Sequence, residues 1–186
     1  MINFKKNKNK GFTFIELMIV IFIMTVGITA IYTSITRIIS STTYSTLNLT
    51  ANYLAQEGIE IVKSIRDSNF IETTFIETTT SGSFIETTTS GSWKKDLSPG
   101  NYEADYNDYS LSSLQDNECR FLKVDEEGFF NYKDGSDSPF KRKITITEDP
   151  NNENVLINVS VTVYWTEKGK TNETTVSENL YNLYPL

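Results

Sequence analysis

The chain has 186 residues, 38% hydrophobic and 22% charged, a balance typical of a folded protein. Its net charge is −7, with 17 basic and 24 acidic residues, which argues against nonspecific nucleic-acid binding. It has no histidine and one cysteine, Cys119, which excludes a Cys–His nucleophile, a zinc site and an intrachain disulfide. Cys119 is either buried or a free thiol, and burial is the favoured interpretation.

The first eleven residues form a basic leader, which ends at Gly11. Four lysines lie within it, and the first acidic residue of the chain is Glu16. No residue from Leu17 to Thr36 is charged, and about 20 such residues cross a bilayer as a helix. Because the lysines precede this run, the positive-inside bias predicts a cytoplasmic leader and an external C-terminus. A secretory signal peptide fits poorly, because it would be cut after its apolar run.

Glu16 lies at the start of the apolar run. An unpaired carboxylate is costly there, about 2.5–3.5 kcal/mol for an acid at a helix centre, so an ordinary single-span anchor does not explain it. Gly11, Phe12 and Glu16 resemble the prepilin peptidase site of type IV pilins and type II secretion pseudopilins. The resemblance implies cleavage after Gly11, N-methylation of Phe12, and pairing of Glu16 with the terminal amine of a neighbouring subunit during filament assembly. A carboxylate near a helix N-terminus is also electrostatically favoured.

The resemblance implies a structural subunit, a minor pilin or pseudopilin, rather than an enzyme. Its expected partners are other pilin subunits, the prepilin peptidase and methyltransferase, membrane lipid and the pilus assembly platform. No cofactor and no metal are expected. The subunit would reside in the inner or cytoplasmic membrane and later reach the cell surface in a filament. Two alternatives stay open, a major pilin of the same apparatus and a membrane-anchored extracytoplasmic binding module that does not polymerise.

One long helix is predicted over residues 12–67, a membrane-spanning half followed by an amphipathic half. Apolar residues recur at helical spacing in the second half, which predicts a stripe that packs on a sheet. Gly58 lies on this stripe and costs ~1 kcal/mol relative to alanine in a helix, so we expect helix and sheet to approach closely there. The Ser/Thr-rich residues 40–46 are expected to bend or fray. The stripe comprises Leu47, Ala51, Leu54, Ala55, Gly58, Ile61, Val62 and Ile65.

Residues 68–95 are predicted to form a polar loop that contains a tandem repeat. The nine residues Phe75–Ser83 recur without change at Phe84–Ser92, and a partial copy, Phe70–Thr74, precedes them. Three short copies are too few for a solenoid. A flexible loop is the favoured interpretation, and short Thr-rich hairpins or an O-glycosylated tract are the alternatives.

Residues 96–186 are predicted to form a β-rich head arranged as a meander. The clearest strand is 155–165, in which Val155, Ile157, Val159, Val161, Val163 and Trp165 share one face. Further strands are expected at 102–106, 119–124, 129–132, around Ile144 and Ile146, and at 171–183. The predicted fold class is therefore α+β, a long N-terminal helix packed on a C-terminal antiparallel sheet, as in pilins.

The head is similar to that of a minor-pilin subgroup over residues 55–60, residues 138–144 and the strand that ends at Trp165. Heads in this family often close with a C-terminal disulfide, which a single cysteine excludes. Residues 141–143 form a candidate basic patch. Asp105 with Asp108, Asp134 with Asp137, and the acidic residues 148, 149 and 153 offer oxygen ligands for calcium. Solvated turns are the favoured interpretation of these acidic groups.

Overall fold

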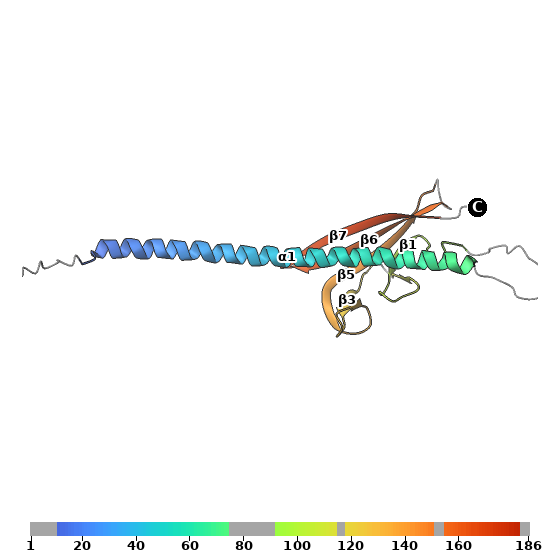
Figure 1. Cartoon of the computed structure of the whole chain (residues 1–186), viewed down its shortest axis with the longest axis horizontal. Helices are drawn as coiled ribbons and strands as arrows, with labels where there is room; N and C mark the ends of the chain where they lie inside the picture. The colour runs from blue at the N-terminus through green and yellow to red at the C-terminus, as the bar shows by residue number, and fades with distance from the viewer. Residues whose placement is uncertain (1–10, 75–91, 115–117, 151–154, 183–186) are drawn as a thin grey trace, which may run out of the picture. The chain divides into compact units, whose positions relative to one another are not determined.

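The structure, a computed structural model of the chain, describes residues 11–74, 92–114, 118–150 and 155–182. These residues form one helix, α1 (Phe14–Thr74), and an antiparallel seven-stranded sheet (Figure 1). The α+β class predicted from the sequence is confirmed. The strands are β1 (Gly100–Glu103), β2 (Ser112–Ser113), β3 (Phe121–Val124), β4 (Phe130–Asn131), β5 (Ser136–Glu148), β6 (Leu156–Glu167) and β7 (Lys170–Tyr181).

The chain forms two compact units, residues 1–45 and 46–186, and α1 contributes to both. The division falls within the Ser/Thr-rich stretch, which is helical throughout, so the expected fraying is wrong. The hydroxyls of Ser40 and Thr43 each donate to the carbonyl four residues earlier, at 3.0 Å. Hydroxyl groups that could compete with the helical hydrogen bonds are thus bonded along the helix itself.

The helix continues past Asp67, where the sequence predicted its end, to Thr74. Contacts with the segment after the repeat tract hold these extra turns in place. The amide of Asn69 donates to the carbonyls of Trp93 and Lys95 at 3.2 and 2.7 Å, and the rings of Phe70 and Trp93 stack with centroids 6.3 Å apart. The partial repeat copy is therefore helical, whereas residues 75–91 of the two full copies lie outside the described residues.

Strand β5 is the centre of the sheet. Along one edge it pairs with β6 over residues 140–148, and β6 pairs with β7 over its whole length. Along its other edge β5 pairs with β3 near its start and with β1 near its end. Strands β1 and β2 pair with each other, as do β3 and β4, and β5, β6 and β7 follow one another. The predicted meander is wrong at the joins between these groups, because β1 and β3 both pair with β5. A strand of 13 residues is long enough to hold two short partners end to end.

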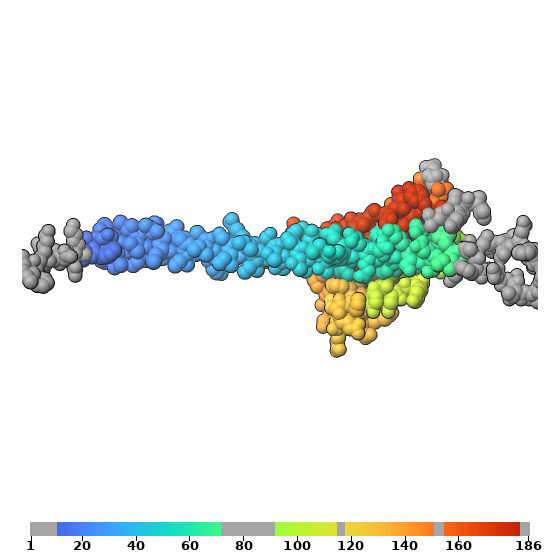
Figure 2. Space-filling model, in the orientation of Figure 1, coloured from blue at the N-terminus to red at the C-terminus, as the bar shows by residue number. Residues whose placement is uncertain are grey.

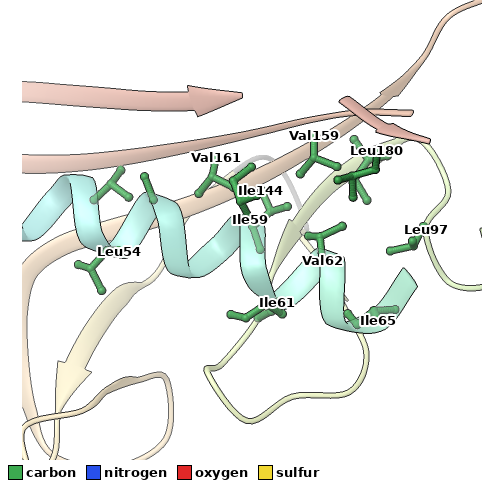
Figure 3. Packing of buried hydrophobic residues seen from close by; sticks show 14 of the residues in the cluster. Leu54, Ile59, Ile61, Val62, Ile65, Leu97, Ile144, Val159, Val161 and Leu180 are labelled. Atoms are coloured by element: carbon green, nitrogen blue, oxygen red, sulfur yellow. The ribbon is translucent and has the colours of Figure 1, made fainter. Parts of the chain in front are cut away.

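The core of the head lies between the sheet and the second half of α1 (Figure 3). The predicted stripe is confirmed, with Ile59 as an additional buried member and Leu47 partly buried at its edge. The predicted inner face of β6 is confirmed from Ile157 to Trp165, each side chain being at most 2% exposed. Val155 is the exception, because it precedes the strand and is exposed.

Helix and sheet approach each other most closely at Gly58, as the sequence predicted. A Cβ atom on Gly58 would lie 2.8 Å from Cγ1 of Val161 on β6 and 3.4 Å from Cδ of Arg142 on β5. The first distance is too short for a real methyl group. The missing side chain therefore makes room for both the sheet and the stem of the arginine.

Arg142 is fully buried and joins three parts of the head. Its Nη1 donates to the Leu54 carbonyl at 3.2 Å and to Glu57 Oε1 at 2.8 Å, and its Nη2 donates to the Ala104 carbonyl at 2.6 Å. Because side chains alternate along β5, the flanking Lys141 and Lys143 are only partly buried. The three residues therefore do not form the candidate basic patch.

We expect Gly58→Ala to destabilise the head, although alanine is the better helix former by ~1 kcal/mol. The added methyl would clash with Val161, and overpacking a core costs about 1–3 kcal/mol. The measurement is thermal unfolding of the full chain in micelles, followed by the near-ultraviolet dichroism of its two tryptophans. Ser64→Ala, at an exposed position of the same helix, is the matched control and should not lower the midpoint. A midpoint for Gly58→Ala at or above that of the control would contradict the close approach.

Candidate functional site

Thr13 and Glu16 begin α1 with a reciprocal pair of side-chain contacts. The backbone N–H and hydroxyl of Thr13 each lie 3.5 Å from Glu16 Oε2 and donate to it. The backbone N–H of Glu16 in turn donates to the Thr13 hydroxyl at 3.4 Å. This is a capping box, in which two residues of the first helical turn each accept a hydrogen bond from the other's backbone N–H group, which has no partner within the helix. The carboxylate of Glu16 therefore lies at the positive end of the helix dipole.

Gly11 and Phe12 precede the helix and are both exposed. A Cβ atom on Gly11 would meet nothing within 4 Å, so the fold itself does not require glycine at this position. Phe12 is 76% exposed and makes no ring contact among the described residues. The structure thus places Gly11, Phe12 and Glu16 within one short stretch of chain that is open to solvent.

The part of α1 that follows is apolar on every side. Every large apolar side chain from Phe12 to Ile39 is exposed, with fractions from 41% at Val20 to 77% at Phe14. The mean hydropathy of its most apolar 18-residue window is 2.5, and none of that window is buried. By length and composition this helix can cross a membrane. Such a surface needs lipid or other apolar helices around it.

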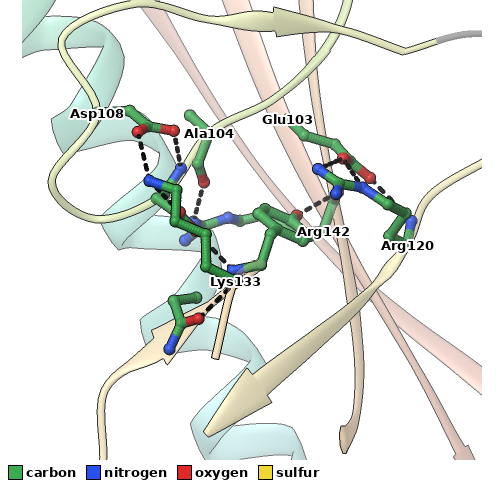
Figure 4. Close-up of polar contacts among 9 residues, drawn as sticks. Glu103, Ala104, Asp108, Arg120, Lys133 and Arg142 are labelled. Atoms are coloured by element: carbon green, nitrogen blue, oxygen red, sulfur yellow. Dashed lines mark hydrogen bonds and ion pairs between the residues drawn. The ribbon is translucent and has the colours of Figure 1, made fainter. Parts of the chain in front are cut away.

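Two of the acidic residues weighed as calcium ligands do come together in the head. Asp105 is 2% exposed, so the interpretation as a solvated turn is wrong for it. Lys133 Nζ lies 3.2 Å from Asp105 Oδ2 and 3.5 Å from Asp108 Oδ1 (Figure 4). The hydrogen bond to Asp105 and the charge of Asp108 hold the pKa of Lys133 above its ordinary value. A lysine ammonium thus acts as the counter-ion of these carboxylates.

The other acidic groups do not gather into a comparable cluster. Glu148 pairs with Lys94 at 2.6 Å, while Glu153 lies outside the described residues. Among the residues that the structure describes, no group of three metal-ligating side chains is found. Nearby, the buried carboxylate of Glu103 accepts hydrogen bonds from the backbone and the guanidinium of Arg120, at 2.8 and 2.7 Å.

The sequence interpretation missed the burial of three charged residues of the head, Glu103, Asp105 and Arg142. A signal for Arg142 was present, because it alternates with Phe140, Ile144 and Ile146 and so falls on the apolar face of its strand. Glu103 had no such signal, since its partner Arg120 lies 17 residues away on another segment. Charged residues are rarely buried unless they are paired, which biases any interpretation of sequence toward exposure.

Comparison with known proteins supports the N-terminal assignment. Residues 6–32 match a family model described as a prokaryotic N-terminal methylation motif. No curated protein and no solved structure gives a significant match to the chain. The motif and the long apolar helix make this a protein that resembles type IV prepilins and pseudopilins. The same match indicates a structural protein rather than an enzyme, and it suits anchoring in a membrane.

Cys119 is half-buried rather than fully buried, and it forms no disulfide. Burial raises the pKa of its thiol, so at neutral pH the reactive thiolate is scarcer than in an exposed cysteine. We expect iodoacetamide to alkylate Cys119 severalfold more slowly in the folded chain than in urea. We also expect the pH at which the alkylation rate rises to be higher in the folded chain than in urea. Because the chain has one cysteine, the rate measured by mass spectrometry needs no further assignment. Identical pH profiles in the two states would refute the raised pKa.

Proposed function

We propose that the chain is a minor pilin or pseudopilin, a subunit of a type IV pilus or a type II secretion-like filament. The observation that carries the proposal is the methylation motif over residues 6–32, with an acid at the first turn of a helix whose large apolar side chains are all exposed as far as Ile39. A prepilin peptidase would cleave the leader after Gly11, and the same machinery would methylate the new amine of Phe12. The subunit would then enter a filament through its apolar helix.

Glu16 is the residue that would select the partner during assembly. Cleavage creates a cation at Phe12, and a carboxylate on a neighbouring helix can neutralise it away from water. In the single chain the contacts of Glu16 with Thr13 are long, at 3.4–3.5 Å, and involve neutral donors. An ammonium donor adds the attraction between two opposite charges, which the neutral donors of Thr13 lack. Exchange of the Thr13 contacts for the neighbour's amine would therefore favour the assembled state.

The expected topology places the leader in the cytoplasm and residues 46–186 outside the membrane, because basic residues precede the apolar run. Lipid would surround the exposed apolar helix before assembly, and other pilin helices would replace the lipid afterwards. Small and hydroxyl-bearing residues let such helices approach one another, and residues 25–36 contain several, including Gly27 and Ala30. An assembly platform in the membrane would drive the exchange, and filament growth would carry the head to the cell surface.

Gly11→Val tests the processing step. We expect the variant to retain its leader in cells that contain the peptidase, because the enzyme must fit the residue on each side of the cut bond. The fold has room for a side chain at Gly11, so loss of cleavage cannot be attributed to misfolding. The measurement is the mass of the chain extracted from membranes. Gly27→Val, which also meets free space, is the control and should be cut normally. Removal of the leader from Gly11→Val would count against cleavage at this bond.

Glu16→Gln tests the assembly step. Glutamine also serves in a capping box, so the start of α1 should be unchanged while the negative charge is lost. We expect normal cleavage but a filament yield at least about tenfold lower, the effect of about 1.4 kcal/mol in an equilibrium. Sheared filaments are quantified by immunoblot against the membrane-bound pool. Normal filament incorporation of this variant would exclude the proposed role of the charge. If the leader also stays uncut in the wild-type chain, the alternative of a non-polymerising anchored module is favoured.

A further inference from the structure

The head carries an exposed aromatic pair that takes no part in its core. The rings of Tyr106 and Phe129 stack with centroids 5.2 Å apart and an interplanar angle of 21°. Tyr106 is 43% exposed and Phe129 is 48% exposed. Both residues lie outside the strands, one after β1 and the other before β4. Phe129 thus holds the Tyr106 ring in one orientation while much of that ring remains open to solvent.

Tyr106 lines an open pocket of about 220 Å³, together with Asp125, Asn131, Lys133 and Asp134 among others. The pocket belongs to the part of the head around β3 and β4, which stands out from α1 in yellow and orange (Figure 2). Sites for drug-sized ligands are typically about 300–1,000 Å³, so this one suits a single small ring.

Asn131 contributes to this pocket an amide group whose orientation is fixed by hydrogen bonds. It is 7% exposed, and its Oδ1 accepts hydrogen bonds from the backbone N–H groups of Lys133 and Asp134, each at 2.8 Å. These two bonds fix the orientation of the amide group. Its Nδ2 donates to none of the residues that the structure describes. The side chain as a whole is more than nine-tenths buried, while this nitrogen is itself accessible to solvent. A donor of fixed orientation is therefore available to a ligand.

Acceptors lie beside this donor. Asp125 uses Oδ1 to accept from the backbone N–H groups of Glu127 and Phe129, at 3.0 and 2.9 Å, which leaves Oδ2 without a partner among the described residues. The carboxylate of Asp134 likewise has no partner within the described part of the chain. Lys133 is already engaged by Asp105 and Asp108, so the lining carries more negative than positive charge. Anions are disfavoured there.

We infer that this pocket binds one uncharged pyranose ring at the end of a glycan. The C–H face of such a ring is apolar and packs on the face of an aromatic side chain, here Tyr106. Its hydroxyls donate to the carboxylates of Asp125 and Asp134, and one of its oxygens accepts from Asn131 Nδ2. Calcium is the less suitable ligand, because it takes 6–8 oxygens and two free carboxylates supply too few. The assignment is independent of filament assembly, since it concerns the head alone.

The test is saturation-transfer NMR on the full chain in a micelle of a detergent without sugar, with the methyl glycosides of galactose, glucose, mannose and N-acetylglucosamine as probes. We expect at least one glycoside to receive saturation on the protons of its apolar face. Tyr106→Ala and Asn131→Asp should each weaken its binding about tenfold, as for the loss of one ring contact or one hydrogen bond. Asn131→Asp keeps the oxygen that accepts from the backbone, and the exposed Tyr106 can be truncated without loss of core contacts.

Tyr109→Ala is the matched control, because Tyr109 is 89% exposed and does not line the pocket. It should bind the glycoside as the wild-type chain does. Saturation that persists in Tyr106→Ala, or an absence of saturation with all four glycosides, would overturn the assignment. Calcium that shifts the Asp125 and Asp134 resonances and binds more tightly to Asn131→Asp would also overturn it, in favour of a cation site.

Discussion

The head depends on one contact between helix and sheet, where Glu57 and Gly58 of α1 meet Arg142 and Val161. A buried guanidinium is costly unless each of its donors finds a partner, and here two carbonyls and a carboxylate satisfy most of them. The absence of a side chain at Gly58 admits both the Val161 methyls and the arginine stem. Because Arg142 contacts carbonyls on both α1 and the segment after β1, it fixes the position of the helix along the sheet. A shift of one helical turn would leave the charge buried and unpaired.

Two patterns of the sequence were sufficient to predict most of the fold, because each records burial on one face. The apolar stripe of α1 and the alternating valines of β6 form the two sides of the core, and Gly58 marked their closest approach. The connections among the first strands could not be predicted in this way. Strands β1 and β3 both pair with β5 along the same edge. A local sequence pattern does not indicate which strands pair with a long strand, or along which of its edges.

The N-terminal motif over residues 6–32 could be recognised in the sequence because its residues lie close together along the chain and their chemistry is unusual. An acid at the start of an apolar run is conspicuous in any sequence. The capping box adds a physical role that the sequence interpretation did not include, since the acid also begins the helix. In contrast, the pocket beside Tyr106 is built from three loop or turn segments and strand β4. The orientation of Asn131 arises from backbone groups that only the folded chain brings together.

The contacts at the end of α1 bear on how the repeat tract can change over time. Asn69 precedes the tract and bonds to the carbonyls of Trp93 and Lys95, which follow it, so the two points where the tract joins the head are fixed beside each other. The entropic part of the free-energy cost of closing a loop grows slowly, by about 0.6 kcal/mol for each doubling of the loop length. Copies of nine residues can therefore be gained or lost by replication slippage at little cost to stability. The chain can thus vary in length between Asn69 and Trp93 while the contacts that join these two residues stay the same.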